Sequence, residues 1–90
     1  MLKIKDKVNL EVLKSFGFEK DGICYEYQLK RYDHDEPQEV FIIVYLEDFR
    51  AYKQRELYLY LGEDLPEDEL YKLDILFDLI QAGLVEKVGD

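Results

Sequence analysis

The sequence predicts an α+β domain in which a short N-terminal helix, a three- to four-stranded antiparallel sheet and a longer C-terminal helix follow one another (α-β-β-β-α). Two observations support this fold class. Apolar residues alternate with polar ones in the middle of the chain, as in a strand, and recur every three or four residues near its end, as in a helix. Because no linker or repeat interrupts the 90 residues, we expect one domain, residues 1–90.

A short first helix is expected over residues 10–16. Asn9 is a suitable N-cap, because its side chain can accept a hydrogen bond from a free amide of the first turn. Gly17 can adopt the left-handed conformation that ends a helix. The Asp21-Gly22 dipeptide then indicates a tight turn, and residues 18–20 before it are expected to pair with the strand that follows.

Three strands are expected in the middle of the chain. Residues 23–31 alternate between apolar and polar side chains, which is typical of a half-buried strand. Residues 32–37 are charged and contain a proline, and they predict a loop. Residues 40–46 are apolar throughout and rich in β-branched side chains, which indicates a central strand. Residues 56–61 alternate again and predict the third strand.

The second helix is expected to begin near Asp64. Asp64 resembles an N-cap with Glu67 three residues on, Pro66 suits the first turn, and acidic residues gather where the helix dipole is positive. Gly83 is expected to end the helix, and Leu84 to pack back on its last turn. The apolar face of this helix is predicted to comprise Leu70, Leu73, Leu76, Phe77, Leu79 and Ile80.

Two short helices can cover only one face of such a sheet, so the other face is predicted to expose an aromatic and aliphatic patch. Patches of this composition are typical of protein interfaces, and a 90-residue domain of marginal stability benefits from self-association. We therefore expect a homodimer; the alternative is that the helices lie on opposite faces, or that the chain termini cover the patch, so that the patch is ordinary core. The candidate interface residues are Phe41, Ile43, Tyr45, Tyr58 and Tyr60.

The composition excludes several classes of function. The net charge is −9, and residues 61–90 carry nine acidic residues against two lysines, which disfavours direct nucleic-acid binding. The longest apolar run, residues 40–46, is far shorter than a membrane span, and the first residues do not resemble a secretion signal. We expect a cytoplasmic protein without membrane contact. Cys24 is the only cysteine, which agrees with a reducing compartment, and it is expected to be a small buried residue.

No residue pattern indicates an enzyme, a cofactor or a metal site. Asp33, His34 and Asp35 could suggest metal ligands, but consecutive residues of one loop do not converge on a common point. A second hypothesis, an acidic inhibitor that imitates DNA and blocks a basic host DNA-binding protein, uses one acidic edge of the second helix. The alternative for that edge is a solvated surface that keeps the domain soluble. The candidate residues are Glu63, Glu67, Asp68, Tyr71, Asp74 and Asp78.

Two segments carry a family resemblance. Residues 73–88 (LDILFDLIQAGLVEKV) and residues 13–20 (LKSFGFEK) resemble small uncharacterised proteins of phages and prophages of Gram-positive bacteria. The resemblance implies a viral or mobile-element context and supplies no catalytic residues. The sequence thus predicts a non-enzymatic protein-interaction domain that self-associates.

Overall fold

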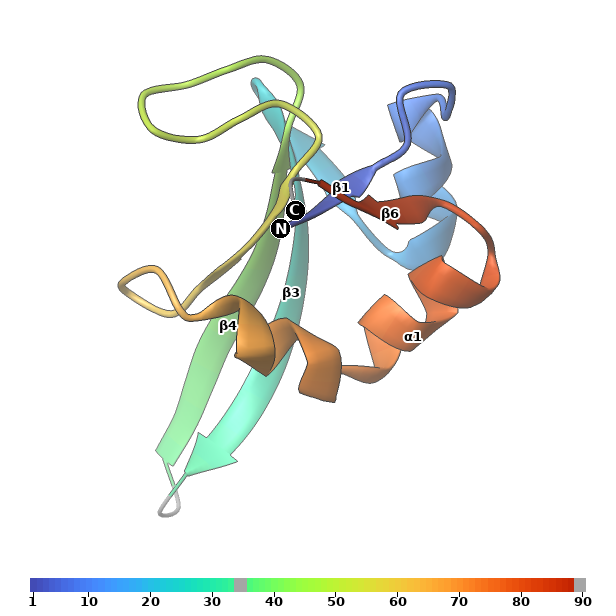
Figure 1. Ribbon diagram of the computed structural model, residues 1–90. Helices are drawn as coiled ribbons and strands as arrows, with labels where there is room; N and C mark the ends of the chain where they lie inside the picture. Colours follow the sequence, from blue (N-terminus) through green and yellow to red (C-terminus); the bar gives the residue numbers. More distant parts are fainter. Residues whose placement is uncertain (34–35, 89–90) are drawn as a thin grey trace.

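The computed structural model describes residues 1–33 and 36–88, and for residues 30–33, 36–38 and Glu67 it describes the backbone alone. The fold is α+β with antiparallel sheets, as the sequence predicts (Figure 1). The elements in chain order are β1 (Leu2–Ile4), the 3-10 helix η1 (Leu10–Phe16), β2 (Glu19–Asp21), β3 (Cys24–Asp33), β4 (Glu36–Tyr45), β5 (Leu57–Tyr60), the 3-10 helix η2 (Glu67–Lys72), α1 (Asp74–Gln81) and β6 (Val85–Lys87).

Four strands form the main sheet in the order β2-β3-β4-β5, and every neighbouring pair is antiparallel. The prediction of a central position for β4 is confirmed. β1 and β6 form a separate two-stranded sheet that brings the two ends of the chain together (Figure 1). The predicted order is wrong at its start, because β1 precedes the first helix; Leu2 and Ile4 alternate with Lys3 and are both buried.

The β3–β4 hairpin is longer than predicted. The expected loop over residues 32–37 is wrong, since β3 continues to Asp33 and β4 begins at Glu36, with those two residues paired. The charged residues and Pro37 therefore do not end these strands, because the backbone pairing between β3 and β4 includes Pro37 and continues to the pair Asp33 and Glu36. His34 and Asp35 lie outside the described residues.

The first helical segment agrees with the prediction. The Asn9 side chain accepts a hydrogen bond from the Glu11 amide at 3.0 Å, and Gly17 has the left-handed φ of 97°. Residues 10–16 form a 3-10 rather than an α-helix. The predicted pairing before the Asp21-Gly22 turn is also confirmed, as β2 pairs with β3.

The predicted second helix is wrong in two respects. It is divided at Leu73, whose extended backbone (ψ 131°) separates η2 from α1. Asp64 is not its N-cap: Pro66 occupies that position, and the Asp64 carboxylate instead accepts a hydrogen bond from the Tyr52 hydroxyl at 3.0 Å. The ending at Gly83 is confirmed by its φ of 74° and by the bond from the Leu84 amide to the Leu79 carbonyl.

The helical segments lie on one side of the main sheet (Figure 1), and we call the sheet face toward them the inner face. The division at Leu73 changes which residues of α1 are buried: Ile75, Leu76 and Leu79 pack inward, while Phe77 is 61% and Ile80 47% exposed. Their predicted place on the packed face of the helix is therefore wrong. The inner face contributes Tyr25, Val40, Ile42, Val44, Leu57 and Leu59 to the core, each no more than 3% exposed.

Candidate functional site

The outer face of the main sheet, opposite the helices, carries the predicted interface residues. The register places Phe41 opposite Tyr60 and Ile43 opposite Tyr58 on adjacent strands. These residues and Tyr45 are half-buried, except Tyr60, which is 36% exposed. The sheet therefore brings all five predicted residues onto one surface.

The β4–β5 loop, residues 46–56, covers part of this surface. It lies at the top left of Figure 1 and places two aromatic rings against the outer face. The Tyr45 ring stacks between Phe49 and Tyr52, with centroid distances of 5.7 and 5.2 Å. Tyr52 also meets Tyr58 edge to face at 4.9 Å. Sequence reasoning missed Phe49 and Tyr52, because they belong to no periodic segment.

The hydroxyl groups of Tyr52 and Tyr58 in this aromatic cluster have hydrogen-bond partners. The Tyr58 hydroxyl accepts from the Lys53 amide at 2.8 Å and donates to the Glu56 carboxylate at 2.7 Å. Burial, together with the negative charge of Glu56, raises the pKa of Tyr58 to about 12. The Tyr58 phenol is thus neutral near neutral pH and acts as a hydrogen-bond donor to Glu56.

Three residues of the predicted interface remain outside the loop cluster: Phe41, Ile43 and Tyr60. A depression of about 250 Å³ borders Phe41 and is also lined by Glu26 and Gln28. We call Phe41, Ile43 and Tyr60 the open patch. It combines an apolar centre with a recess that an incoming side chain can enter, which are features of protein–protein contact surfaces.

A small acidic group lies on the β2–β3 side of the outer face. The Cys24 Sγ atom is 3.3 Å from the Asp21 carbonyl oxygen and 3.7 Å from the Glu26 carboxylate. Burial and the nearby carboxylates raise the pKa of Cys24 to about 11, so the thiol is protonated and weakly nucleophilic. Burial and Asp21 also raise the pKa of Glu26. Cys24 is buried, as the sequence predicts.

The predicted acidic helix edge is divided. Because the chain is extended at Leu73, the candidates on η2 and those on α1 do not follow one helical stripe. Glu63, Asp68, Tyr71, Asp74 and Asp78 are exposed, and the side chain of Glu67 is outside the described part. The prediction that these residues form one acidic edge of a single helix is therefore wrong. Its use in binding a basic host protein stays a prediction.

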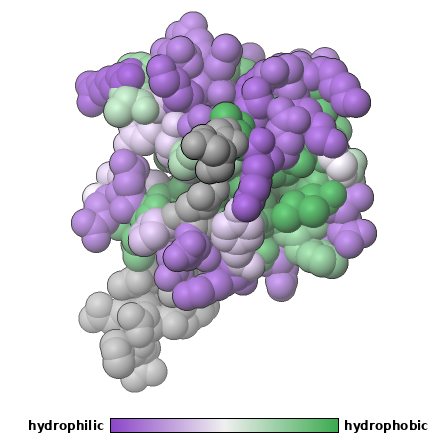
Figure 2. Space-filling view, in the orientation of Figure 1, coloured by the Kyte–Doolittle hydropathy of each residue, from purple (hydrophilic) through white to green (hydrophobic). Residues whose placement is uncertain are grey.

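A second apolar surface, absent from the sequence-based prediction, lies on α1. Figure 2 shows a hydrophobic area over α1, and two apolar residues of this helix, Phe77 and Ile80, are exposed. The helical period alone places both residues on the packed face, so only the division at Leu73 accounts for their exposure.

Within residues 1–33 and 36–88, no group of three or more His, Cys, Asp or Glu side chains is arranged to hold a metal ion. His34 and Asp35, the central residues of the candidate metal loop, lie outside this part of the chain. The helices in the same part are too short or too polar to cross a membrane.

No protein-family model, curated protein or solved structure matches the chain. The resemblance to phage and prophage proteins therefore stays a prediction, as does the cytoplasmic location. The surfaces described above are the basis for a functional proposal.

Proposed function

We propose that the chain is a non-enzymatic protein-interaction domain that self-associates through the open patch on the outer face. The observation that supports this most directly is the contrast between adjacent residues of β4. Ile42 is fully buried beneath the helical segments, whereas Ile43, which points the other way, is only half-buried. Apolar side chains that remain in contact with water favour association, because burying them releases free energy in proportion to the area covered.

The composition of the open patch fits a symmetric dimer. Tyrosine and phenylalanine are enriched at interfaces, since their rings supply contact area and little side-chain entropy is lost. In a two-fold dimer, the same patch on both copies forms the interface, and Phe41 of one copy meets the recess beside Phe41 of the other. Glu26 lies opposite Ile43 and, with Glu19, lines the recess beside Phe41, so these two carboxylates border the proposed interface.

Sedimentation equilibrium over a range of concentrations tests the proposal. The wild-type chain of 10.8 kDa is expected to approach twice its monomer mass as concentration rises. The double variant Ile43→Glu with Tyr60→Glu is expected to stay monomeric, because four carboxylates would be brought together at the two-fold axis.

Tyr71→Glu is the matched control, since Tyr71 is also an exposed tyrosine but lies on η2 and away from the outer face. It should dimerise like the wild type. A wild-type chain that remains a monomer at every concentration, or a control that loses dimerisation as completely as the double variant, contradicts the proposal.

A further inference from the structure

The main sheet has an open edge along the second half of β3. β2 pairs only with Cys24–Glu26, although β3 continues to Asp33. From Gln28 onward, no strand of the described part lies beside β3 on the side away from β4. An unpaired edge of this kind is a template for another extended segment.

The ladder with β4 indicates which backbone groups face the open edge. The Leu46 amide donates to the Ile23 carbonyl at 2.7 Å, so the odd-numbered residues of β3 exchange hydrogen bonds with β4. The N–H and C=O groups of the even-numbered residues point the other way. At Gln28, Lys30 and Tyr32, these groups therefore have no strand partner in the described part of the molecule.

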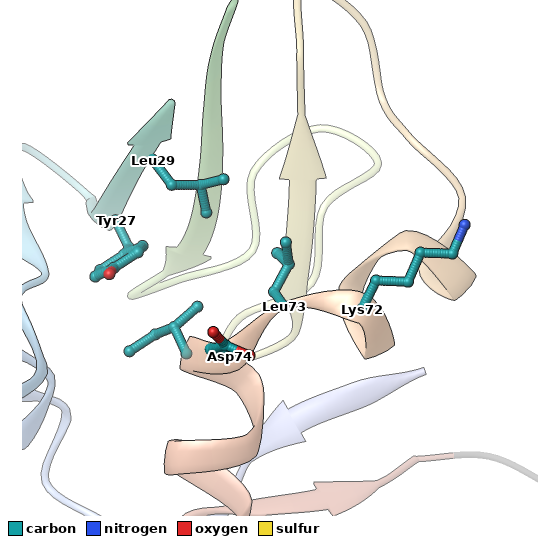
Figure 3. Close-up of a pocket in the computed structure, with 6 residues that line it drawn as sticks. Tyr27, Leu29, Lys72, Leu73 and Asp74 are labelled. Atoms are coloured by element: carbon teal, nitrogen blue, oxygen red, sulfur yellow. The ribbon is translucent and has the colours of Figure 1, made fainter. Parts of the chain in front are cut away.

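A pocket of about 270 Å³ lies beside this edge, between β3 and the start of α1 (Figure 3). Its walls are mainly apolar: Tyr27 and Leu29 from β3 lie across from Leu73 (Figure 3), and Ile75 also lines the pocket. Because alternate side chains of a strand point to the same face, a segment added to β3 would direct every second side chain toward this pocket. The pocket can hold one aliphatic side chain.

Among the side chains that the structure describes, two charged ones, Lys72 and Asp74, also line the pocket. The Lys72 ammonium is 3.2 Å from the Glu69 carboxylate, which compensates its charge. Asp74 is exposed and forms no ion pair with any residue in the described ranges. Among the described side chains of the lining, Asp74 is therefore the charged group without an ion pair, and the net charge of the chain is −9.

We propose that this edge binds an extended, basic peptide segment of another protein. The segment adds as a fifth strand next to β3, places an aliphatic side chain in the pocket, and directs a lysine or arginine two residues away toward Asp74. Main-chain hydrogen bonds at Gln28 and beyond hold the strand, and the pocket and Asp74 select its side chains. The pocket lies on the inner face and the open patch on the outer face, and the two sites meet at Gln28, which also borders the recess beside Phe41.

The probe is a ten-residue threonine-rich peptide with one central leucine and a lysine two residues to either side. Titrated into the full-length ¹⁵N-labelled chain, it is expected to shift the Gln28 amide resonance and to slow its hydrogen exchange by about tenfold or more. The amides of Tyr27 and Leu29 already bond to β4 and should change little. The same peptide with N-methyl groups on its edge-facing amides should not bind.

Charge selection is tested with a matched peptide in which glutamates replace the lysines. Asp74→Lys is expected to weaken the lysine peptide about tenfold and to strengthen the glutamate peptide at low salt. Asp78→Lys is the control, since it alters the net charge equally from an exposed position on the same helix outside the pocket lining. It should change the affinity by roughly twofold or less.

Several outcomes would overturn the proposal. The glutamate peptide could bind the wild type as well as the lysine peptide, or the N-methylated peptide could bind unchanged. Asp78→Lys could match Asp74→Lys in its effect. Slow exchange of the Gln28 amide that depends on protein concentration alone, and that persists in the double variant Ile43→Glu with Tyr60→Glu, would show that a second copy occupies the edge.

Discussion

The inner and outer faces of the main sheet are formed by alternate residues of the same strands, but their apolar side chains are covered in different ways. The inner face is aliphatic apart from Tyr25 and Tyr27, and the helical segments and the β1–β6 sheet bury most of it, with Tyr27 and Leu29 half-buried beside the pocket. The outer face is aromatic, and a single loop covers part of it through ring stacking and hydroxyl hydrogen bonds. We infer that the inner face contributes most of the stabilising core packing, and that the outer face is available for contacts with other molecules.

The largest expected effect on the free energy of unfolding comes from a comparison of two adjacent isoleucines on β4. Ile42→Ala should lower the free energy of unfolding by about 2–4 kcal/mol, because it leaves a cavity in a fully packed core. Ile43→Ala should cost less than about 1 kcal/mol in the monomer, since its side chain is half-exposed before the change. Urea unfolding of both variants at low concentration measures the difference. Equal losses would mean that the two faces are equally packed.

This contrast between the faces is the part of the fold that the sequence predicts best. Alternation in β3 and β5 assigns each residue to a face, and the capping signals at Asn9 and Gly17 fix the first helix. The same local reasoning fails at Asp64, because its carboxylate bonds to a tyrosine twelve residues away, and no pattern within one turn reveals that partner.

The other features that the sequence did not predict also depend on tertiary contacts. The break at Leu73 lies between two buried residues, Leu70 and Leu76, and Phe77 is exposed in spite of its helical spacing. The loop over the outer face depends on positive φ angles at Arg50 and Arg55, neither of which is a glycine that would have signalled a turn. The open edge of β3 appears only once the length of β2 is known.

A smaller effect is expected for the hydroxyls that hold the loop over the outer face. Tyr58→Phe removes the acceptor of the Lys53 amide and the donor to Glu56, and should lower the free energy of unfolding by about 1 kcal/mol. Tyr60→Phe is the matched control on the same strand, since no hydrogen bond of the Tyr60 hydroxyl is present in the described part. Thermal unfolding monitored by circular dichroism compares the two. Identical melting temperatures would show that the loop does not depend on Tyr58.

The smallest expected effect is a pH dependence of the free energy of unfolding that arises from Glu26 on the outer face. Burial, followed by the neighbouring Asp21 carboxylate, raises the pKa of Glu26 above its ordinary value of 4.5. The folded state therefore holds this proton more tightly than the unfolded state. The corresponding stability is fully present below the unfolded pKa and is lost as the pH rises through the folded pKa.

Glu26→Gln should consequently unfold at a higher urea concentration than the wild type at pH 7, with the difference shrinking toward pH 4. Glu63→Gln removes one negative charge from an exposed position beyond β5 and controls for the change in net charge. If Glu63→Gln stabilises the chain at pH 7 as much as Glu26→Gln does, general repulsion among the carboxylates is the cause. In that case Glu26 is as well solvated as the carboxylates elsewhere on the surface. The outer face would then differ even more from the inner face, where the core residues are buried.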